Sequence, residues 1–184
     1  MSAAGEQQRS PALDRSSPPR HVVVMGVSGT GKTSVGQEVA RRLGWVFVEG
    51  DDLHPPANVA KMSAGTPLDD EDRAPWLAAL GDVLADHHRD GRPCVMTCSA
   101  LKRAYRGLLR GGVPEGAVFF VHLGASFEVL RERMEAREHF MPASLLQSQL
   151  DTLEPLEADE TGMVVDVAQS LEDVVSEVLV ALGR

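Results

Sequence analysis

One glycine-rich segment limits what this chain can fold into. Gly26-Val27-Ser28-Gly29-Thr30-Gly31-Lys32-Thr33 matches the phosphate-binding pattern G-x-x-x-x-G-K-[ST] at every fixed position. An apolar, β-branched run at residues 21–25 precedes it, and residues 34–43 follow it with apolar side chains at helical spacing. Strand, glycine turn and helix N-terminus together let backbone N–H groups surround a phosphate. The segment therefore predicts a nucleoside triphosphate site in an α/β fold.

The loop also predicts how the nucleotide is held. Lys32 can reach the outer phosphates, and the Thr33 hydroxyl can ligate Mg²⁺. The expected ligands of the loop are a nucleoside triphosphate and Mg²⁺. The predicted nucleotide contacts are Gly26, Ser28, Gly29, Thr30, Gly31, Lys32, Thr33 and Ser34.

Strand-like and helix-like segments alternate along the rest of the chain. Further strands are expected at 45–49, 94–97, 117–123 and 163–167, and further helices at 58–62, 69–84, 102–110, 127–137, 145–153 and 171–182. Asp69 to Asp72 offer an N-cap for the helix expected at 69–84, and Pro75 is expected in the first turn of that helix. This alternation, together with the phosphate loop, predicts a three-layer α/β P-loop fold with a five-stranded parallel sheet covered by helices on both faces.

Composition sets the domain plan and excludes several functions. The polar, Pro- and Ser-rich residues 1–20 are expected to form a disordered tail, and residues 21–184 a single domain built around the phosphate loop. A formal net charge of −9 argues against nucleic-acid binding, and no apolar run could span a membrane. Cys94 and Cys98 would lie about 13 Å apart on a strand, too far for a disulfide, and no second ligand pair near His87 and His88 has zinc-like spacing. Free thiols indicate the reducing cytoplasm.

A regulatory GTPase is excluded by a missing motif. Its guanine-reading Asn-Lys-x-Asp cannot occur, because Asn58 is the chain's only asparagine. A formal Asp-x-x-Gly at residues 159–162 precedes the last predicted strand, too late for a metal-sensing switch. Two alternatives remain, a small-molecule kinase and an ATP-binding module without chemistry.

Polar residues follow the second predicted strand at the sheet edge where open α/β folds bind ligands. Asp51 there could accept the proton of an attacking hydroxyl and reach the metal through water, although the pair Asp51-Asp52 could instead cap a turn. His54, Asn58 and Lys61 lie just beyond and suit a polyhydroxylated anionic acceptor. Only three of the eighteen Lys and Arg residues are lysines. Our hypothesis is that lysine is kept only where a compact ammonium group is required, which marks the neighbourhoods of Lys61 and Lys102 as functional alongside Lys32.

This acceptor segment resembles that of gluconate kinases. The matching residues are Gly50-Asp51-Asp52-Leu53-His54-Pro55, Asn58, Lys61-Met62, Gly65, Pro67-Leu68, Asp70, Asp72-Arg73, Trp76-Leu77, Cys98-Ser99-Ala100-Leu101-Lys102, Tyr105-Arg106, His139-Phe140-Met141, Leu146, Gln149 and Thr152-Leu153-Glu154. The resemblance covers residues 21–182, with Glu138 standing where the family pattern leads us to expect glycine. The resemblance implies a three-layer P-loop kinase fold with a small lid. It also implies transfer of the ATP γ-phosphate to the 6-hydroxyl of D-gluconate by a homodimer. A shikimate-kinase-like enzyme is the alternative, although it would carry Asp-x-Asp at the end of the second strand.

The resemblance also assigns roles within the site. The gluconate carboxylate would be bound by Arg73, Lys102 or Arg106, and its hydroxyls by His54, Asn58, Lys61, Ser99 and His139. By analogy with other small kinases, residues 131–143 would form the lid, with Arg133 and Arg137 reaching the transferring phosphate. A solvated helix face is the other interpretation of these arginines, because glutamates lie between them. Gln169, after the fifth strand, is expected over the adenine.

Overall fold

Five parallel strands form the centre of the computed structural model, which describes residues 19–136 and 143–184. They are β1 (His21–Met25), β2 (Val46–Val48), β3 (Cys94–Thr97), β4 (Val118–Gly124) and β5 (Gly162–Asp166). Their order in the sheet is β2-β3-β1-β4-β5, and every neighbouring pair is parallel. The predicted sheet is confirmed.

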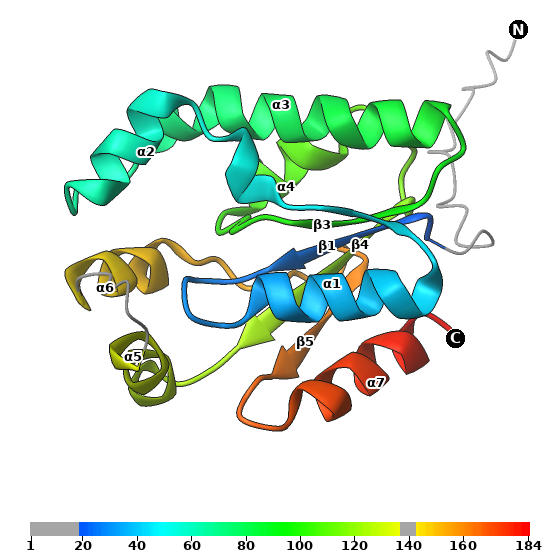
Figure 1. The fold of residues 1–184 in the computed structure, drawn as a ribbon. Coiled ribbons are helices and arrows are strands. Elements are labelled where there is room, and N and C mark those ends of the chain that lie inside the picture. Colours follow the sequence, from blue (N-terminus) through cyan, green and yellow to red (C-terminus); the bar gives the residue numbers. More distant parts are fainter. Residues whose placement is uncertain (1–18, 137–142) are drawn as a thin grey trace, which may run out of the picture.

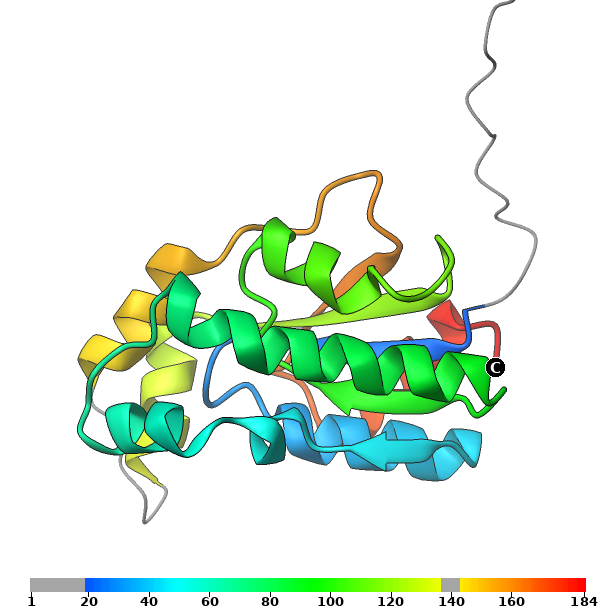
Figure 2. The same ribbon diagram turned by 90° about the horizontal axis from the view of Figure 1, so that it is seen from above.

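Helices cover both faces of the sheet, as Figure 1 shows. The helices α1 (Lys32–Leu43) and α7 (Leu171–Ala181) lie on one face, and α3 (Asp70–Arg89) and α4 (Arg103–Arg110) on the other (Figures 1 and 2). Alternate residues of β1 serve the two layers: Val22 and Val24 pack with α1 and α7, whereas Val23 and Met25 pack with α3 and α4. Because both faces are buried, the strands are continuous apolar runs.

The remaining helices gather at the end of the sheet where the strands finish (Figure 1). They are the 3₁₀ turn η1 (Gly50–Leu53), α2 (Pro56–Ser63), α5 (Phe127–Glu135) and α6 (Ala143–Thr152). The C-terminus lies at the opposite end. Ligand-binding residues are therefore expected along one edge of the sheet, as is general for open α/β folds.

The position of Pro75 in α3 differs from the prediction. Asp69 caps the helix through a capping box with Asp72, as its acidic sequence predicts. The helix therefore begins at Asp70, which places Pro75 in its second turn, not in its first. The prediction for Pro75 was wrong because the cap, and not the proline, sets where the helix begins.

The two cysteines are confirmed as free, buried thiols. Burial raises the pKa of both Cys94 and Cys98 to about 12, which keeps them protonated at neutral pH.

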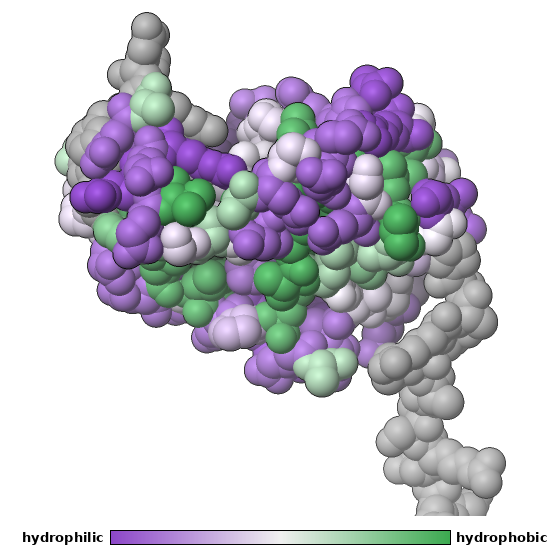
Figure 3. Space-filling view, turned by 90° about the horizontal axis from the view of Figure 1, so that it is seen from below, coloured by the Kyte–Doolittle hydropathy of each residue, from purple (hydrophilic) through white to green (hydrophobic). Residues whose placement is uncertain are grey.

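The predicted tail, residues 1–20, lies almost wholly outside the described residues. Arg20, its last residue, donates its backbone N–H to the Ala117 carbonyl at 3.0 Å and so belongs to the folded part. Within the described ranges, no helix combines the length and the apolar character that crossing a bilayer requires. The face viewed in Figure 3 is mainly hydrophilic, with small separate apolar areas.

Candidate active site

The phosphate loop lies between β1 and α1, as the motif predicts. Gly26 has a φ of 141°, and a Cβ at this position would lie 2.8 Å from the Leu123 carbonyl oxygen, so the sharp turn after β1 needs glycine. Gly31 is left-handed at the N-cap of α1. The loop is braced internally, since the Thr30 hydroxyl and the Lys32 ammonium both donate to the Val27 carbonyl, at 2.9 and 3.1 Å.

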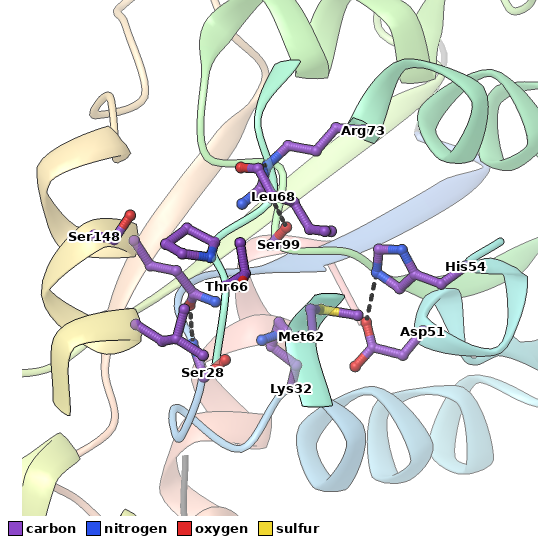
Figure 4. A pocket seen from close by; sticks show the side chains of 13 residues that line it. Ser28, Lys32, Asp51, His54, Met62, Thr66, Leu68, Arg73, Ser99 and Ser148 are labelled. Carbon is purple, nitrogen blue, oxygen red and sulfur yellow. Dashed lines mark hydrogen bonds and ion pairs between the residues drawn. The ribbon is translucent and has the colours of Figure 1, made fainter. Parts of the chain in front are cut away.

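A pocket opens beside this loop, and side chains enter it from several elements (Figure 4). Lys32 and Ser28 come from the phosphate loop, Asp51 and His54 from the region of η1, and Arg73 from α3. The lining is Ser28, Lys32, Asp51, His54, Met62, Thr66, Pro67, Leu68, Arg73, Ser99, Leu145, Ser148 and Gln149. Segments distant in sequence thus bring the lysine of the phosphate loop, a carboxylate and a second cation to one cavity.

Asp51 and His54 are adjacent in this pocket. The His54 Nε2 lies 3.9 Å from the Asp51 Oδ1, and its ring stacks on Trp76 with the centroids 4.0 Å apart. Burial lowers the pKa of His54; the Asp51 carboxylate opposes that shift and Arg73 adds to it. The net lowering favours a neutral imidazole, which can donate or accept a hydrogen bond. The Asp51 side chain is 69% exposed and so is accessible to an incoming hydroxyl.

Gly50 holds η1 against the sheet. A Cβ on Gly50 would lie 1.9 Å from the Thr97 carbonyl oxygen, so no other residue fits this approach. Its N–H donates to the Thr97 hydroxyl at 3.0 Å, and its carbonyl accepts the Trp76 indole N–H at 2.8 Å. These bonds fix the backbone immediately before Asp51.

Arg73 and Ser99 form another wall of the pocket (Figure 4). The Arg73 guanidinium donates to the Leu68 carbonyl at 3.3 Å and to the Ser99 hydroxyl at 3.5 Å. Arg73 is only 7% exposed and lies 5.8 Å from the centroid of the Tyr105 ring. A guanidinium held in this way can bind a carboxylate with two hydrogen bonds.

An acidic residue that the sequence analysis left without a role contacts the phosphate loop. Glu49, directly after β2, accepts a hydrogen bond from the Thr33 hydroxyl at 2.7 Å and another from the Thr97 hydroxyl. Hydroxyl and carboxylate oxygens are the ligand types that Mg²⁺ prefers. Only the position of Glu49, two residues before Asp51 at the carboxyl end of a strand, could have indicated it.

A second pocket lies on the other side of the loop. Its lining includes Gly29, Thr30, Gly31 and Ser34 from the loop and α1, together with Arg133, Val167 and Gln169. The Arg133 guanidinium donates to the Val167 carbonyl, and the Gln169 amide donates to Glu177 at 3.0 Å. Both residues therefore border the loop, on the side away from Asp51. Arg137, Glu138 and His139 lie outside the described residues.

Three predicted substrate contacts do not line the pocket that contains Lys32, Asp51 and Arg73. The amide of Asn58, which is buried, donates to the Asp72 carbonyl at 2.7 Å, and Lys61 pairs with the Asp72 carboxylate, also at 2.7 Å. Lys102 pairs with Asp70 at 2.8 Å. Both lysines pair with acidic side chains in the first turn of α3. These pairs join α2, and the residue that precedes α4, to α3.

The interpretation of Arg106 as a substrate cation is wrong. Its side chain is fully buried and pairs with the equally buried Glu160 through two hydrogen bonds of 2.8 and 2.7 Å. It also donates to backbone carbonyls of Ala100, Leu101, Glu154 and Pro155. Arg106 thus holds the segment before β5 against α4. The sequence could not show this, since Glu160 is 54 residues away.

The phosphate loop after the first strand of a parallel sheet, with an acceptor pocket beside it, defines a P-loop kinase. A family model described as an AAA domain matches residues 22–156. Among curated relatives, the gluconokinase of Gluconobacter oxydans is 54% identical over 163 residues, covering 88% of this chain and 90% of that protein. The thermoresistant gluconokinase of Escherichia coli is 45% identical over 164 residues, with 88% and 93% covered. A solved gluconokinase from Sinorhizobium meliloti superposes with a TM-score of 0.83 at 53% identity, covering 90% of this chain and 93% of that one. The chain belongs to the gluconokinase family.

Proposed function

We propose that this chain transfers the γ-phosphate of ATP to the 6-hydroxyl of D-gluconate, giving 6-phosphogluconate and ADP. One observation carries the proposal: a single pocket, which we call the acceptor pocket, is lined by Lys32, Asp51 and Arg73. The second pocket, lined by Gly29, Thr30 and Gly31, is called the nucleotide pocket. These residues supply a cation for the transferred phosphate, a carboxylate for the hydroxyl and a cation for the substrate carboxylate. The names of relatives that share up to 54% of their residues with this chain support the choice of gluconate.

The chemistry requires positioning and charge neutralisation more than covalent work by the protein. The acceptor oxygen forms a bond to the γ-phosphorus while the bond from that phosphorus to the bridging oxygen of ADP breaks. The hydroxyl proton passes to Asp51 and then to solvent. Lys32 and the phosphate-loop N–H groups neutralise the charge that develops on the phosphoryl oxygens. Arg133, at the border of the nucleotide pocket, would add a further cation.

Thr33 and Glu49 are the residues that would hold Mg²⁺, with Asp51 reaching it through water. The 2.7 Å bond between the Thr33 hydroxyl and the Glu49 carboxylate places two oxygen ligand types side by side, which fits the ion. When bound, Mg²⁺ neutralises and orients the phosphates. No cluster of three or more His, Cys, Asp or Glu suited to a metal occurs in the described part of the chain. That is compatible with Mg²⁺, which takes most of its ligands from water and phosphate.

The second pocket would take the nucleoside. Gln169 and Val167 follow β5 and face the loop glycines, in keeping with a place beside adenine. We also propose that the enzyme acts as a homodimer in the cytoplasm. The resemblance to gluconate kinases supports the dimer, and the free thiols support a reducing compartment.

ADP release with Mg-ATP and a panel of D-gluconate, shikimate, AMP and glucose tests the proposed reaction. We expect turnover with gluconate alone. Turnover with another acceptor and none with gluconate would contradict the acceptor assignment and leave the kinase class intact. ATP binding without turnover on any of the four would indicate a nucleotide-binding module.

Arg73→Ala is expected to raise the KM for gluconate about 10- to 100-fold, the range for losing hydrogen bonds to a charged group. The KM for ATP should stay within about threefold, because Arg73 does not line the nucleotide pocket. Lys102→Ala is the control: Lys102 was an equal candidate from sequence, but it pairs with Asp70 outside the pocket. Initial rates with each substrate varied in turn measure both constants. An equal rise in the two KM values for Arg73→Ala, or a larger gluconate effect for Lys102→Ala, would contradict this assignment.

A further inference from the structure

The phosphate loop passes from one pocket to the other between residues 28 and 29. Ser28 and Lys32 line the acceptor pocket, whereas Gly29, Thr30 and Gly31 line the nucleotide pocket. The group that leaves ATP for the acceptor must cross this boundary. The Ser28 N–H therefore lies where the transferred phosphoryl group is expected.

This N–H donates to a side chain from a helix distant in sequence. It donates to the Oε1 of Gln149, on α6, at 2.7 Å. A carboxamide oxygen is a neutral acceptor that makes the same kind of hydrogen bond to an N–H as a phosphate oxygen does. The two cannot use one N–H in the same direction at once, so Gln149 and an incoming phosphoryl oxygen compete for it.

We propose that Gln149 competes with the transferred phosphoryl group, because its side-chain oxygen accepts the Ser28 N–H that this group would otherwise use. This inference rests on the proposed kinase function. Binding of ATP displaces the Gln149 oxygen, and departure of the phosphoryl group on the acceptor lets it return. The half-buried N–H is thus satisfied at each stage, and no stage leaves an unpaired donor, which would cost free energy.

The exchange also connects the nucleotide to the acceptor. Leu145 and Ser148, on the same helix as Gln149, line the acceptor pocket. Displacing Gln149 from Ser28 removes this hydrogen bond between the helix and the phosphate loop, while Leu146 and Leu150 keep the helix packed in the core. A residue on the wall of the acceptor pocket thus contacts the phosphoryl site directly.

The test compares two nucleotides that differ by the transferred group. Calorimetry with Mg²⁺ would measure the affinities of wild type and Gln149→Ala for ADP and for the non-hydrolysable β,γ-imido analogue of ATP. Removing the competing oxygen should tighten analogue binding about twofold to tenfold, the range of one net hydrogen bond. ADP binding should change by less than about twofold, because ADP lacks the group that competes.

Gln147→Ala is the matched control. Gln147 lies two residues earlier on α6, is exposed and donates to Asp151 at 2.7 Å. We expect it to leave both affinities unchanged. Gln149→Glu tests the same site with opposite sign, because a carboxylate there would repel the phosphoryl group and weaken the analogue more than ADP.

Equal changes for ADP and the analogue in Gln149→Ala would overturn the proposal, as would weaker analogue binding or no change in either affinity. The comparison uses no acceptor. Its failure is therefore distinguishable from a failure of gluconate to be phosphorylated, which only the acceptor panel detects.

Discussion

Replacing Asp51 by Asn should lower kcat for gluconate phosphorylation about 10²- to 10⁴-fold, the usual contribution of a general base. The amide has nearly the shape of the carboxylate but cannot accept the hydroxyl proton. Affinity for the ATP analogue should change little, because Asp51 does not line the nucleotide pocket. ADP release measures the first quantity and calorimetry the second.

Geometry supports Asp51 over its neighbour. Asp51 lines the acceptor pocket, and its carboxylate faces His54 there (Figure 4). Asp52 is exposed and is not among the residues that line the pocket. Asp52→Asn is therefore a matched control with the same chemical change one residue away, and it should retain kcat within about threefold. A comparable loss in both variants, or an Asp51→Asn enzyme at full rate, would rule out the base.

The second large effect is on stability. Arg106→Met should lower the free energy of unfolding by about 3–5 kcal/mol, as expected when one partner of a buried ion pair is removed. Glu160 would then keep its buried charge without the guanidinium, and four backbone carbonyls would lose a donor. Urea unfolding followed by circular dichroism measures the change.

Arg110→Met provides the control for this variant. Arg110 lies one turn further along α4 and approaches the same Glu160 at 3.9 Å, but its side chain is 32% exposed. Its loss should cost less than about 1 kcal/mol. The Arg106→Met protein that remains folded should keep its KM for gluconate. A raised KM with unchanged stability would restore the substrate role that the sequence had indicated.

The difference in unfolding free energy between wild type and Arg106→Met is expected to depend on pH. Burial is the largest single influence and by itself raises the pKa of the Glu160 carboxyl. The hydrogen bonds from Arg106 and from the Glu157 backbone, together with the charges of Arg106 and Arg110, more than offset it, so the folded-state pKa lies below the ordinary value of 4.5. The pair therefore stabilises the native state fully above about pH 4.5, and its contribution is lost as the pH falls through the folded-state pKa. Without Arg106, a protonated Glu160 tolerates burial. The stability gap between wild type and Arg106→Met should accordingly narrow on acidification.

Features that depend on neighbouring residues were predicted well from the sequence. The phosphate loop was located from its glycines, because the left-handed Gly29 and Gly31 and the turn at Gly26 are requirements of the local backbone. An N-cap within Asp69 to Asp72 was predictable because capping involves residues a few positions apart, and the structure shows that Asp69 is the cap, in a capping box with Asp72. The strand segments were visible as apolar runs because both faces of a parallel sheet are buried.

Partner choice among charged residues was not predictable in the same way. Lys61, Lys102 and Arg106 were all candidates for binding an anion, and each instead meets an acidic side chain of the protein. The sequence indicates Glu49 only as the end of a strand, yet its carboxylate accepts a hydrogen bond from Thr33, which lies 16 residues earlier in the chain. Nothing in a charged residue's own neighbourhood says which opposite charge the fold will bring to it.

The sequence by itself therefore determined the kinase class, the order of strands and helices and the place of the phosphate loop, since backbone conformation and apolar periodicity are local properties. Only the tertiary structure decided which cations line the acceptor pocket. Arg73 and Lys32 line that pocket, whereas Arg106 is buried in an ion pair with Glu160. A long charged side chain hydrogen-bonds to whichever partner the packing of the fold places within reach. The bond from Ser28 to Gln149 joins residues 121 positions apart and likewise exists only in the fold.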